Sequence, residues 1–276
     1  MHKRQLQYFL NACSLGGEIG SVIWEYKSKS KKLFTRCITG DKGMLGVLSC
    51  NSLYDFSNDT ETELRLNWNW GKDFKIGIYD LAQLKKMISI LDDTELKIVL
   101  DVDNNKVISM DINDGHSTMT YLCSDLSVIN QVPALKTLPD FETLIFTLTD
   151  SKKRFRSAIG VFEKDITFNV MENTKSKTKG LDEIIFCIGH STSTPTNRVD
   201  VCFGSPRVGL DDDDHYYETT KVGKVFEILD MFGVVSTMEI SNQGLARISN
   251  NRKYAPTNET KYGIRYDYYI VQVSSY

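Results

Sequence analysis

Four segments with helical periodicity and basic residues recur along the chain at nearly constant spacing, and this repeat constrains the fold more than any single motif does. The segments begin near Lys3, Leu81, Ser151 and Lys221, so successive starts lie 78, 70 and 70 residues apart. A chain of 276 residues is long enough for two medium-sized cores. The repeat therefore predicts two similar domains.

Each segment places its apolar residues on one helical face. In residues 80–91, Asp80 is a favourable N-cap, and an apolar stripe of leucine and isoleucine follows. Lys85 and Lys86 point away from that stripe. We expect the same construction in residues 150–162, and amphipathic helices in residues 3–13 and 221–232.

Between these segments the periodicity changes to that of strands. The alternating or β-branched runs are residues 22–26, 34–39, 74–79, 96–102, 106–112, 118–122, 144–148, 165–171, 183–188, 199–203, 234–240 and 264–273. About three strands follow each helix. The pattern predicts an α+β protein in which each helix covers one face of a sheet.

A stretch without clear periodicity lies near the middle of the chain, at residues 124–141, and contains Pro133 and Pro139. It predicts a linker. We place an N-terminal domain at 1–130, the linker at 131–141 and a C-terminal domain at 142–276. By composition we expect polar loops at 51–63, 173–179, 191–197, 205–218 and 250–262.

The composition is that of an ordinary globular protein, with 41% hydrophobic residues and a formal net charge of −3. No apolar run approaches the roughly 18–20 residues that span a bilayer, and the N-terminus does not resemble a signal peptide. We expect no membrane association and a cytoplasmic location, which would be the host cytoplasm for a viral protein. The six cysteines form no CxxC pair, which favours buried, reduced thiols.

Seven basic residues lie near helix N-termini, where a helix does not favour them: Lys3, Arg4, Lys152, Lys153, Arg154, Lys221 and Lys224. A helix N-terminus is the positive end of the helix dipole, so lysine there costs a few tenths of a kcal/mol. A nearby polyanion would explain them, because each neutralised phosphate releases counterions. We predict sequence-independent DNA contacts by Lys3, Arg4, Lys85, Lys86, Lys152, Lys153, Arg154, Arg156, Lys221 and Lys224. The alternative is that these residues only keep the helix faces soluble.

Three motifs that could carry chemistry do not meet its requirements. Consecutive carboxylates at 211–214, followed by His215, cannot all face one ion. The run that begins at Asp101 has Lys106 at the glycine position of a calcium loop. Residues 189–193 lack the second glycine of a nucleophile elbow. We therefore expect no catalytic residues, no metal and no cofactor.

Residues 74–130 resemble the N-terminal domain of the sliding clamps of T-even-like phages. In that family a strand ends in a Tyr-Asp-Leu step into a leucine-patterned helix, followed by an acidic break, three strands and a strand end that contains tyrosine. The matching residues here are Tyr79, Asp80, Leu81, Leu84, Ile88, Leu91, Asp92, Asp93 and Tyr121. The second half of the chain matches by arrangement rather than by residues.

The resemblance implies a DNA-clamp fold with two similar domains, each with two helices packed on antiparallel sheets. It also implies a closed homotrimer whose helices line a channel around double-stranded DNA. Such a clamp is not an enzyme; it is a processivity factor that tethers the DNA polymerase and is loaded by a clamp loader. This chain exceeds the family's length, and we place the excess in loops 51–63 and 191–218.

The resemblance further implies an apolar pocket near the linker into which polymerase and clamp loader insert a short peptide. The candidate residues are Val132, Leu135 and Leu138 in the linker and Val271 and Val273 near the C-terminus. Ordinary packing of the linker on the core is the alternative for these five. Two other functions remain open: a replication accessory protein that binds nucleic acid without encircling it, and a β-rich structural virion protein.

Overall fold

A computed structural model gives the fold. It describes residues 2–30, 32–50, 53–54, 63–64, 71–103, 106–135, 137–162, 166–173, 183–189, 197–204, 206, 210, 214–232, 236–250 and 264–273. The chain divides into two compact units. The first unit comprises residues 1–134 and 259–266, and the second comprises 135–258 and 267–276. The division after Ala134 falls inside the stretch predicted as a linker.

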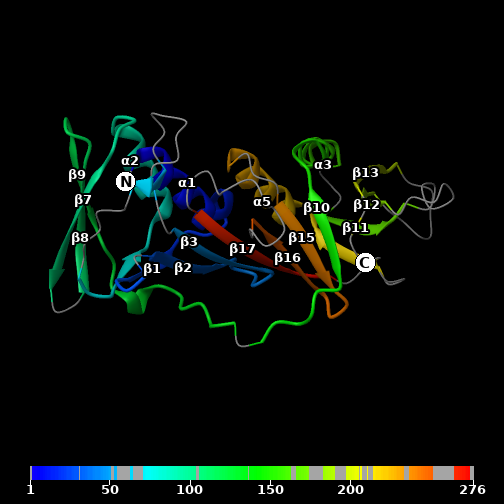
Figure 1. Ribbon diagram of the computed structural model, residues 1–276, viewed down its shortest axis with the longest axis horizontal. Coiled ribbons are helices and arrows are strands. Elements are labelled where there is room, and N and C mark those ends of the chain that lie inside the picture. Colours follow the sequence, from blue (N-terminus) through cyan, green and yellow to red (C-terminus); the bar gives the residue numbers. More distant parts are fainter. Residues whose placement is uncertain are drawn as a thin grey trace. The chain divides into compact units, whose positions relative to one another are not determined.

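The first unit contains two antiparallel sheets (Figure 1). One has the strand order β3-β2-β1-β6, and the other has the order β7-β8-β9. Their bounds are β1 (Val22–Lys27), β2 (Lys32–Ile38), β3 (Met44–Cys50), β6 (Phe74–Ile78), β7 (Lys97–Asp103), β8 (Lys106–Asn113) and β9 (Thr118–Leu122). A further pair of short strands is formed by β4 (Leu53–Tyr54) and β5 (Glu63–Leu64).

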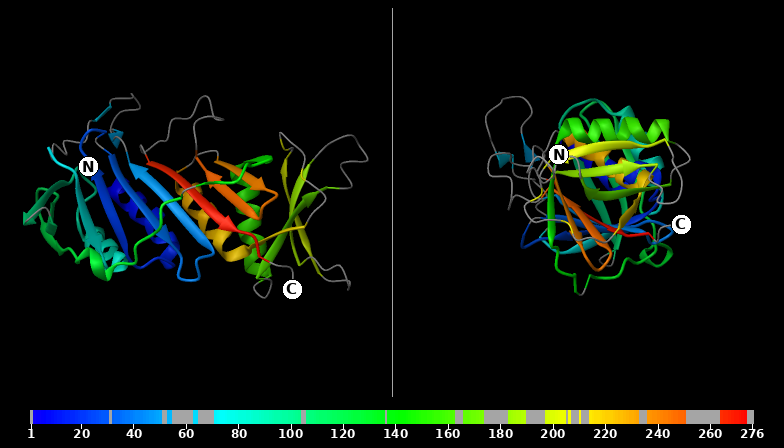
Figure 2. Two further views of the ribbon diagram at one scale, coloured as in Figure 1. Left: turned by 90° about the horizontal axis from the view of Figure 1, so that it is seen from below. Right: turned by 90° about the vertical axis from the view of Figure 1, so that its right-hand side faces the viewer.

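Helices α1 (Lys3–Ser14) and α2 (Leu81–Ile90) cover one face of the first sheet (Figure 2). Asp80 caps α2, because its carboxylate accepts the backbone N–H of Gln83 at 2.7 Å. The apolar stripe of α2 is buried, as its periodicity predicts. Short 3-10 turns follow α1 (η1, Leu15–Gly17) and β9 (η2, Leu126–Val128). Because the apolar sides of α1 and α2 are buried, their polar sides face outward.

The second unit repeats this plan. Strands β10 (Thr143–Thr147), β15 (Ser236–Ser241), β16 (Leu245–Ser249) and β17 (Ile264–Val271) pair in that order, and β17 belongs to this unit from Asp267 onward. A second sheet has the order β13-β12-β11-β14. Those strands are β11 (Thr167–Glu172), β12 (Ile184–Ile188), β13 (Val199–Gly204) and β14 (His215–Glu218). Helices α3 (Thr149–Val161) and α5 (Thr219–Phe232) pack on them. Five phenylalanines meet in the core: Phe155, Phe168, Phe186, Phe203 and Phe226.

All four predicted helices are confirmed, with two corrected starts, because α5 begins at Thr219 rather than at Lys221. Helix α3 begins at Thr149, its N-cap Leu148 provides no side-chain hydrogen bond, and Asp150 lies in the first turn. The sequence missed β3, whose apolar run is interrupted by Gly46, and β16, which is interrupted by Arg247. The loop prediction for 205–218 is wrong at its end, because His215–Glu218 pairs with β11 as a buried strand.

Other loop predictions fall largely outside the described residues. This applies to most of 51–63, to 174–179, to 191–196, to most of 205–213 and to 251–262. Among the cysteines, Cys13, Cys37, Cys50 and Cys187 are buried as expected, whereas Cys202 is exposed. Within the described ranges, no helix is long and apolar enough to cross a membrane, and no cluster of side chains could hold a metal ion.

Candidate nucleic-acid interface

The first residue of α1 is a structural lysine. Lys3 is buried, and its ammonium donates to the carbonyl oxygens of Ser89, at 3.1 Å, and of Leu91. These carbonyls belong to the C-terminal end of α2, where a cation is favoured by the helix dipole and by carbonyls that lack helical partners. Lys3 therefore ties α1 to the end of α2.

Arg4, the next residue, is exposed and carries an ion pair. Its Nε donates to Asp93 Oδ2 at 2.5 Å, and Nη2 also contacts that carboxylate. Both partners are at least 40% exposed, so solvent screens the pair. Arg4 thus remains on the outer side of the first helix pair, α1 and α2, with Asp93 beside it.

A groove between α1 and α2 is lined by polar side chains of both helices. Its volume is about 480 Å³. We call it the α1/α2 groove, and its lining residues are Arg4, Gln7, Tyr8, Asn11, Lys85 and Ser89. Lys85 is half-buried, with its ammonium 3.3 Å from the Ser14 hydroxyl, and this burial lowers its pKa. Lys86 is exposed beside it.

The second helix pair, α3 and α5, holds its cations differently. Lys152 is fully buried and lies 3.4 Å from Asp230 of α5. Arg156, one turn further along α3, lies 3.1 Å from Asp230 and 3.8 Å from Glu227. Burial lowers the pKa of Lys152, and the neighbouring carboxylate of Asp230 only partly offsets this. The two helices are therefore joined by an ion-pair network.

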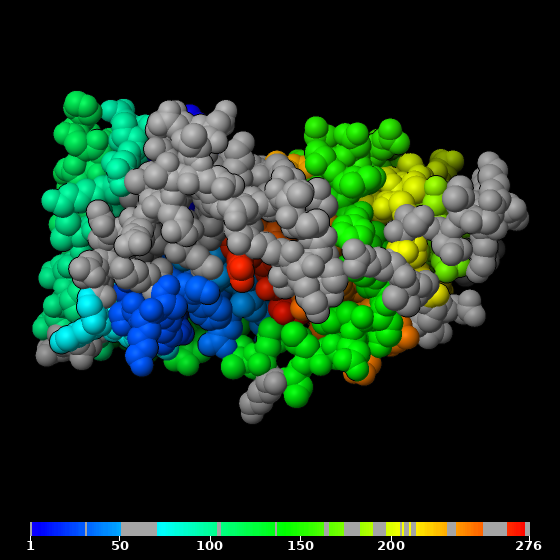
Figure 3. Space-filling model, in the orientation of Figure 1, coloured from blue at the N-terminus to red at the C-terminus, as the bar shows by residue number. Residues whose placement is uncertain are grey.

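The other cations of this helix pair are either buried with an acidic partner or exposed. Lys221 is buried and pairs with Glu218 at 2.6 Å. Lys153 and Arg154 are exposed on α3, whose surface adjoins that of β13 (Figure 3). Lys224 is half-buried on α5.

Three of the ten predicted DNA-contacting residues are thus not on exposed helix faces. Lys3, Lys152 and Lys221 are buried, each with a carbonyl or carboxylate partner, and DNA contact by the ten residues stays a prediction. Asp230 and Glu227 are the residues that the sequence analysis missed. Their spacing of three on α5 was the available signal, since it puts both acids on one side of the helix.

The start of the linker is fixed to the first unit. The backbone N–H of Ser124 donates to the Gly77 carbonyl at 2.9 Å. A Cβ on Gly77 would lie 2.2 Å from the Ser124 oxygen, so only glycine permits this approach. Asp125 caps η2 through Ser127 and pairs with Lys106 at 3.1 Å, and these hydrogen bonds lower its pKa to about 2.

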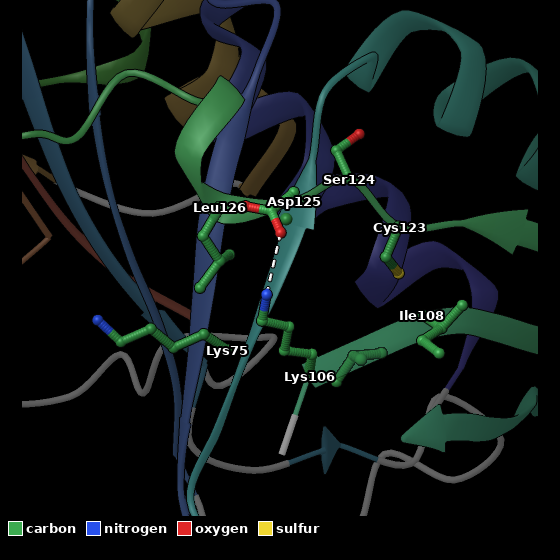
Figure 4. A pocket seen from close by; sticks show the side chains of 9 residues that line it. Lys75, Lys106, Ile108, Cys123, Ser124, Asp125 and Leu126 are labelled. Carbon is green, nitrogen blue, oxygen red and sulfur yellow. Dashed lines mark hydrogen bonds and ion pairs between the residues drawn. The ribbon is translucent and has the colours of Figure 1, made fainter. Parts of the chain in front are cut away.

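A hollow of about 170 Å³ lies beneath this segment (Figure 4). Lys106 reaches to Asp125 across its mouth, Leu126 lies beside that pair, and Cys123 and Ile108 form the opposite wall. Burial raises the pKa of the Cys123 thiol to about 12, so the thiol stays protonated. A smaller hollow of about 90 Å³ adjoins it through Lys75 and Leu126, and Val132 contributes to its wall.

The end of the linker is fixed to the second unit. The Arg247 guanidinium lies 5.0 Å from the centre of the Phe141 ring, and the Glu142 carboxylate accepts the backbone N–H of Asn242. Leu135 and Leu138 lie before these anchors and remain about 40% exposed. The linker thus presents two leucines to solvent beside a fixed end.

The five predicted partner-binding residues divide between the units. Val132 belongs to the first unit, whereas Leu135, Leu138, Val271 and Val273 belong to the second. Val271, the last residue of β17, is exposed, and Val273 lies two residues beyond the strand and is half-buried. Their role in binding a partner peptide stays a prediction.

Each unit ends one sheet in an edge strand. β9 pairs with β8 alone, and β13 pairs with β12 alone, among the described residues. Leu122 at the end of β9 is 72% exposed. An edge with unpaired backbone groups is a template for pairing with another chain.

The comparison with solved structures covers the whole chain. It is similar to the PCNA2–PCNA3 complex from Sulfolobus tokodaii, with 12% identity, coverage of 99% of this chain and 97% of that one, and a TM-score of 0.63. It is also similar to PCNA from Entamoeba histolytica, with 13% identity, coverage of 99% of this chain and 97% of that one, and a TM-score of 0.62. A third similar structure shows the C-terminal region of FEN-1 bound to A. fulgidus PCNA, with 10% identity, coverage of 100% and 98%, and a TM-score of 0.65.

The chain has the DNA-clamp fold. The predicted fold class is thereby confirmed: helices pack on antiparallel sheets in two units, over the full length of the clamp structures. No protein-family model matches the sequence, and no curated protein matches it either. At 10–13% identity the similarity establishes the clamp fold and no activity, so the phage relationship stays a prediction.

Proposed function

We propose that this protein is a non-catalytic sliding clamp that encircles duplex DNA and tethers the replicative DNA polymerase after a clamp loader has placed it. The observation that carries the proposal is the match of the entire two-unit chain to clamp structures, with almost no residues left over on either side. A clamp needs sequence-independent phosphate contacts. Lys86, Lys153 and Arg154, exposed on helices of both units, can supply them.

Assembly into a ring is the second part of the proposal. A subunit with different surfaces at its two units associates head to tail, and such contacts close into a ring when the rotation permits. The edge strands β9 and β13 offer one surface on each unit. We infer that β9 of one copy pairs with β13 of the next, and that three copies of the 31.4 kDa chain, about 94 kDa, complete the ring.

A pair of matched variants tests this assembly. Leu122→Lys places a charge on the exposed end of β9, whereas Val99→Lys places it on β7 of the same sheet, away from that edge. We expect native mass spectrometry at several concentrations to give the three-copy mass for the unaltered protein and for Val99→Lys. Leu122→Lys should shift the mass toward single chains. A single-chain mass for all three at every concentration would contradict the ring.

Partner recruitment is the third part. One of the similar clamps is bound by the C-terminal region of another protein, FEN-1. In this chain, Leu135 and Leu138 are exposed on an extended segment with an anchored end, which suits docking of an apolar peptide. Replacing both leucines with Ser should abolish stimulation of the cognate polymerase and reduce loading, because the clamp loader is expected to use the same pocket, while the variant keeps the assembly mass of the unaltered protein.

The decisive experiment compares retention on circular and linear duplex DNA after loading. A ring slides off free ends but stays on a closed circle, so we expect retention on the circle and loss from the linear form. Cutting the circle should then release the protein. Equal retention on both forms would instead indicate an accessory protein that binds DNA without encircling it. No retention on either would favour the structural virion protein.

A further inference from the structure

The smaller hollow of the first unit, of about 90 Å³, contains an arginine that has no acidic partner among the described residues. We call it the Arg36 hollow. Strands β1, β2 and β6 line one part of it, and the segment from η2 to the start of the linker lines the rest. Its residues, all in the first unit, are Ile23, Glu25, Arg36, Lys75, Leu126, Asn130, Gln131 and Val132.

Arg36 is half-buried in β2, and its neighbours across the sheet are apolar. It lies in register with Ile23 of β1 on one side and with Val47 of β3 on the other. Its guanidinium lies 5.8 Å from the centre of the Phe34 ring, and within the described part of the chain it has no hydrogen bond or ion pair. The five N–H donors of this guanidinium are therefore left for an acceptor that the chain does not supply.

Glu25 is the one carboxylate among the described lining residues, and lysines already neutralise it. Its Oε1 lies 3.2 Å from the ammonium of Lys75, and its Oε2 lies 3.9 Å from that of Lys27. Two cations against one anion leave the lining with a net positive charge. Asn130 and Gln131 add side-chain amides, which donate hydrogen bonds without charge. The hollow is therefore complementary to an anion.

The position of Arg36 in the sheet indicates that this anion is not a phosphate of DNA held against the helices. Buried and half-buried residues alternate along β2, so Thr35 and Arg36 lie on opposite faces. Trp24, the register partner of Thr35, packs on Phe9 of α1 with 5.4 Å between the ring centres. Arg36 thus lies on the face of the sheet that α1 and α2 do not cover (Figure 2).

The size and walls of the hollow favour a carboxylate carried by a peptide. Its volume is far below the roughly 300–1,000 Å³ of small-molecule sites, but it has room for several water-sized groups of roughly 10–15 Å³ each. A guanidinium binds the two oxygens of a carboxylate through two parallel hydrogen bonds. Ile23, Leu126 and Val132 provide apolar walls for the carbon chain that carries the acid.

We propose that the Arg36 hollow binds one carboxylate of a partner peptide that docks at the linker, with Arg36 forming the ion pair and the amides of Asn130 and Gln131 donating hydrogen bonds. This inference rests on the proposed function and adds the chemistry of the partner. The peptide then carries an acidic group for Arg36 besides the apolar side chains for Leu135 and Leu138. Its carboxylate belongs either to an Asp or Glu side chain or to the peptide's C-terminus.

The first experiment uses a random peptide library as the probe, displayed once with free C-termini and once with its C-termini fused to a carrier. It is selected on the unaltered protein, on Arg36→Gln and on Lys97→Gln. Lys97 is the matched control, because it is an exposed lysine of the same unit outside the hollow. We expect an enrichment of Asp and Glu, or of free C-termini, that Lys97→Gln keeps and Arg36→Gln loses. The same enrichment on all three proteins, or on none, would overturn the proposal.

The second experiment measures the affinity of one selected peptide by fluorescence anisotropy. Arg36→Gln should weaken binding about tenfold, the loss expected for a hydrogen bond to a charged group. Arg36→Lys should restore only part of this, because it keeps the charge but not the planar fork. Replacing the peptide's acid by its amide, or amidating its C-terminus, identifies the source of the carboxylate. The change that weakens binding to the unaltered protein should have no further effect on Arg36→Gln, and additive losses would contradict the ion pair.

Failure of this inference is distinguishable from failure of the clamp. Retention of the unaltered protein on circular DNA tests the ring and does not depend on Arg36. Circle-specific retention with additive losses in the peptide experiment overturns the carboxylate site alone. Equal retention on circular and linear DNA, with a selective effect of Arg36→Gln on peptide affinity, overturns the clamp and supports the carboxylate site.

Discussion

The two helix pairs of this protein have similar basic sequences, but the cation between the helices has an acidic partner on the facing helix in one pair and none in the other. In α3 and α5, Lys152 and Arg156 converge on Asp230, and Gly223 lets the helices approach so closely that a Cβ there would lie 2.7 Å from Ile159. In α1 and α2 the helices leave a polar groove, and Lys85 meets no carboxylate among the described residues. A basic residue at a given place in the repeat can thus either join two helices through an ion pair or remain available to a ligand.

What decides between these roles is the partner helix. A lysine that faces an acid across a close helix–helix contact is desolvated and held in place, whereas a lysine over an open groove keeps its charge available. Lys152 and Arg156 therefore hold α3 against α5, whereas Lys85 lies over an open groove. The same distinction predicts which substitutions change stability and which change DNA binding.

The largest expected effect is on the second helix pair. Asp230→Ala leaves Lys152 buried without its carboxylate, and removing one partner of a buried pair costs about 3–5 kcal/mol. The matched change in the first unit, Asp93→Ala, breaks a solvent-exposed pair and should cost no more than about 1 kcal/mol. Urea unfolding followed by far-UV circular dichroism measures both. Equal losses would show that the two pairs are equivalent.

A bulky substitution at the contact between two helices is expected to have the next largest effect, and to cost stability in the second helix pair but not in the first. Gly223→Leu forces a side chain into the contact between α5 and Ile159, which we expect to cost about 1–3 kcal/mol. Gln7→Leu adds a similar side chain in the α1/α2 groove, where there is room, and should change the free energy of unfolding by no more than about 0.5 kcal/mol. The same urea experiment gives both values. A large loss for Gln7→Leu would mean that the groove is tightly packed.

Salt dependence of duplex binding sharpens the comparison between buried and exposed cations. Replacing Lys153 and Arg154 with Gln should reduce the slope of log affinity against log salt by about 1.8, since each phosphate contact contributes about 0.9. Lys152→Met should leave the slope unchanged, because that side chain is buried. Fluorescence anisotropy of a labelled duplex over a salt series provides the measurement. A smaller slope for Lys152→Met would show that Lys152 contacts DNA.

The smallest expected effect is that of acid. Low pH should destabilise the first unit more than the second. The described aspartates whose pKa is lowered, Asp73, Asp114 and Asp125, all belong to it. A carboxylate with a lowered pKa stabilises the folded state above its unfolded pKa of about 3.8 and loses this contribution as the pH falls toward 2. All three tryptophans precede residue 134, so their fluorescence reports on this unit. Asp125→Asn should reduce the fall in its stability between pH 4 and 2, and an unchanged fall would contradict the assignment.

Much of the fold could be predicted from the sequence because helices and strands are local. The apolar stripe of α2 and its Asp80 cap identified that helix within a residue at each end. Buried strands with little alternation were harder. β14 follows a run of aspartates and was assigned to a loop, yet its pairing with β11 outweighs that local composition.

The functional site was less predictable, since burial of a polar side chain depends on distant residues. Lys152 and Lys153 are adjacent in the sequence and similar in chemistry, but one is buried and the other exposed. The α1/α2 groove combines residues about 80 positions apart. No local pattern identifies such a groove.

The sequence by itself determined where the helices and most strands lie and that their polar faces carry basic residues, because side-chain periodicity and capping act within a few residues. Only the tertiary structure decided which cations are neutralised and which remain available. That outcome depends on the distance between helices and on the acids of the facing helix, Asp230 in one unit and none in the α1/α2 groove of the other. Charge is encoded residue by residue, but its solvation and pairing are properties of the packed chain.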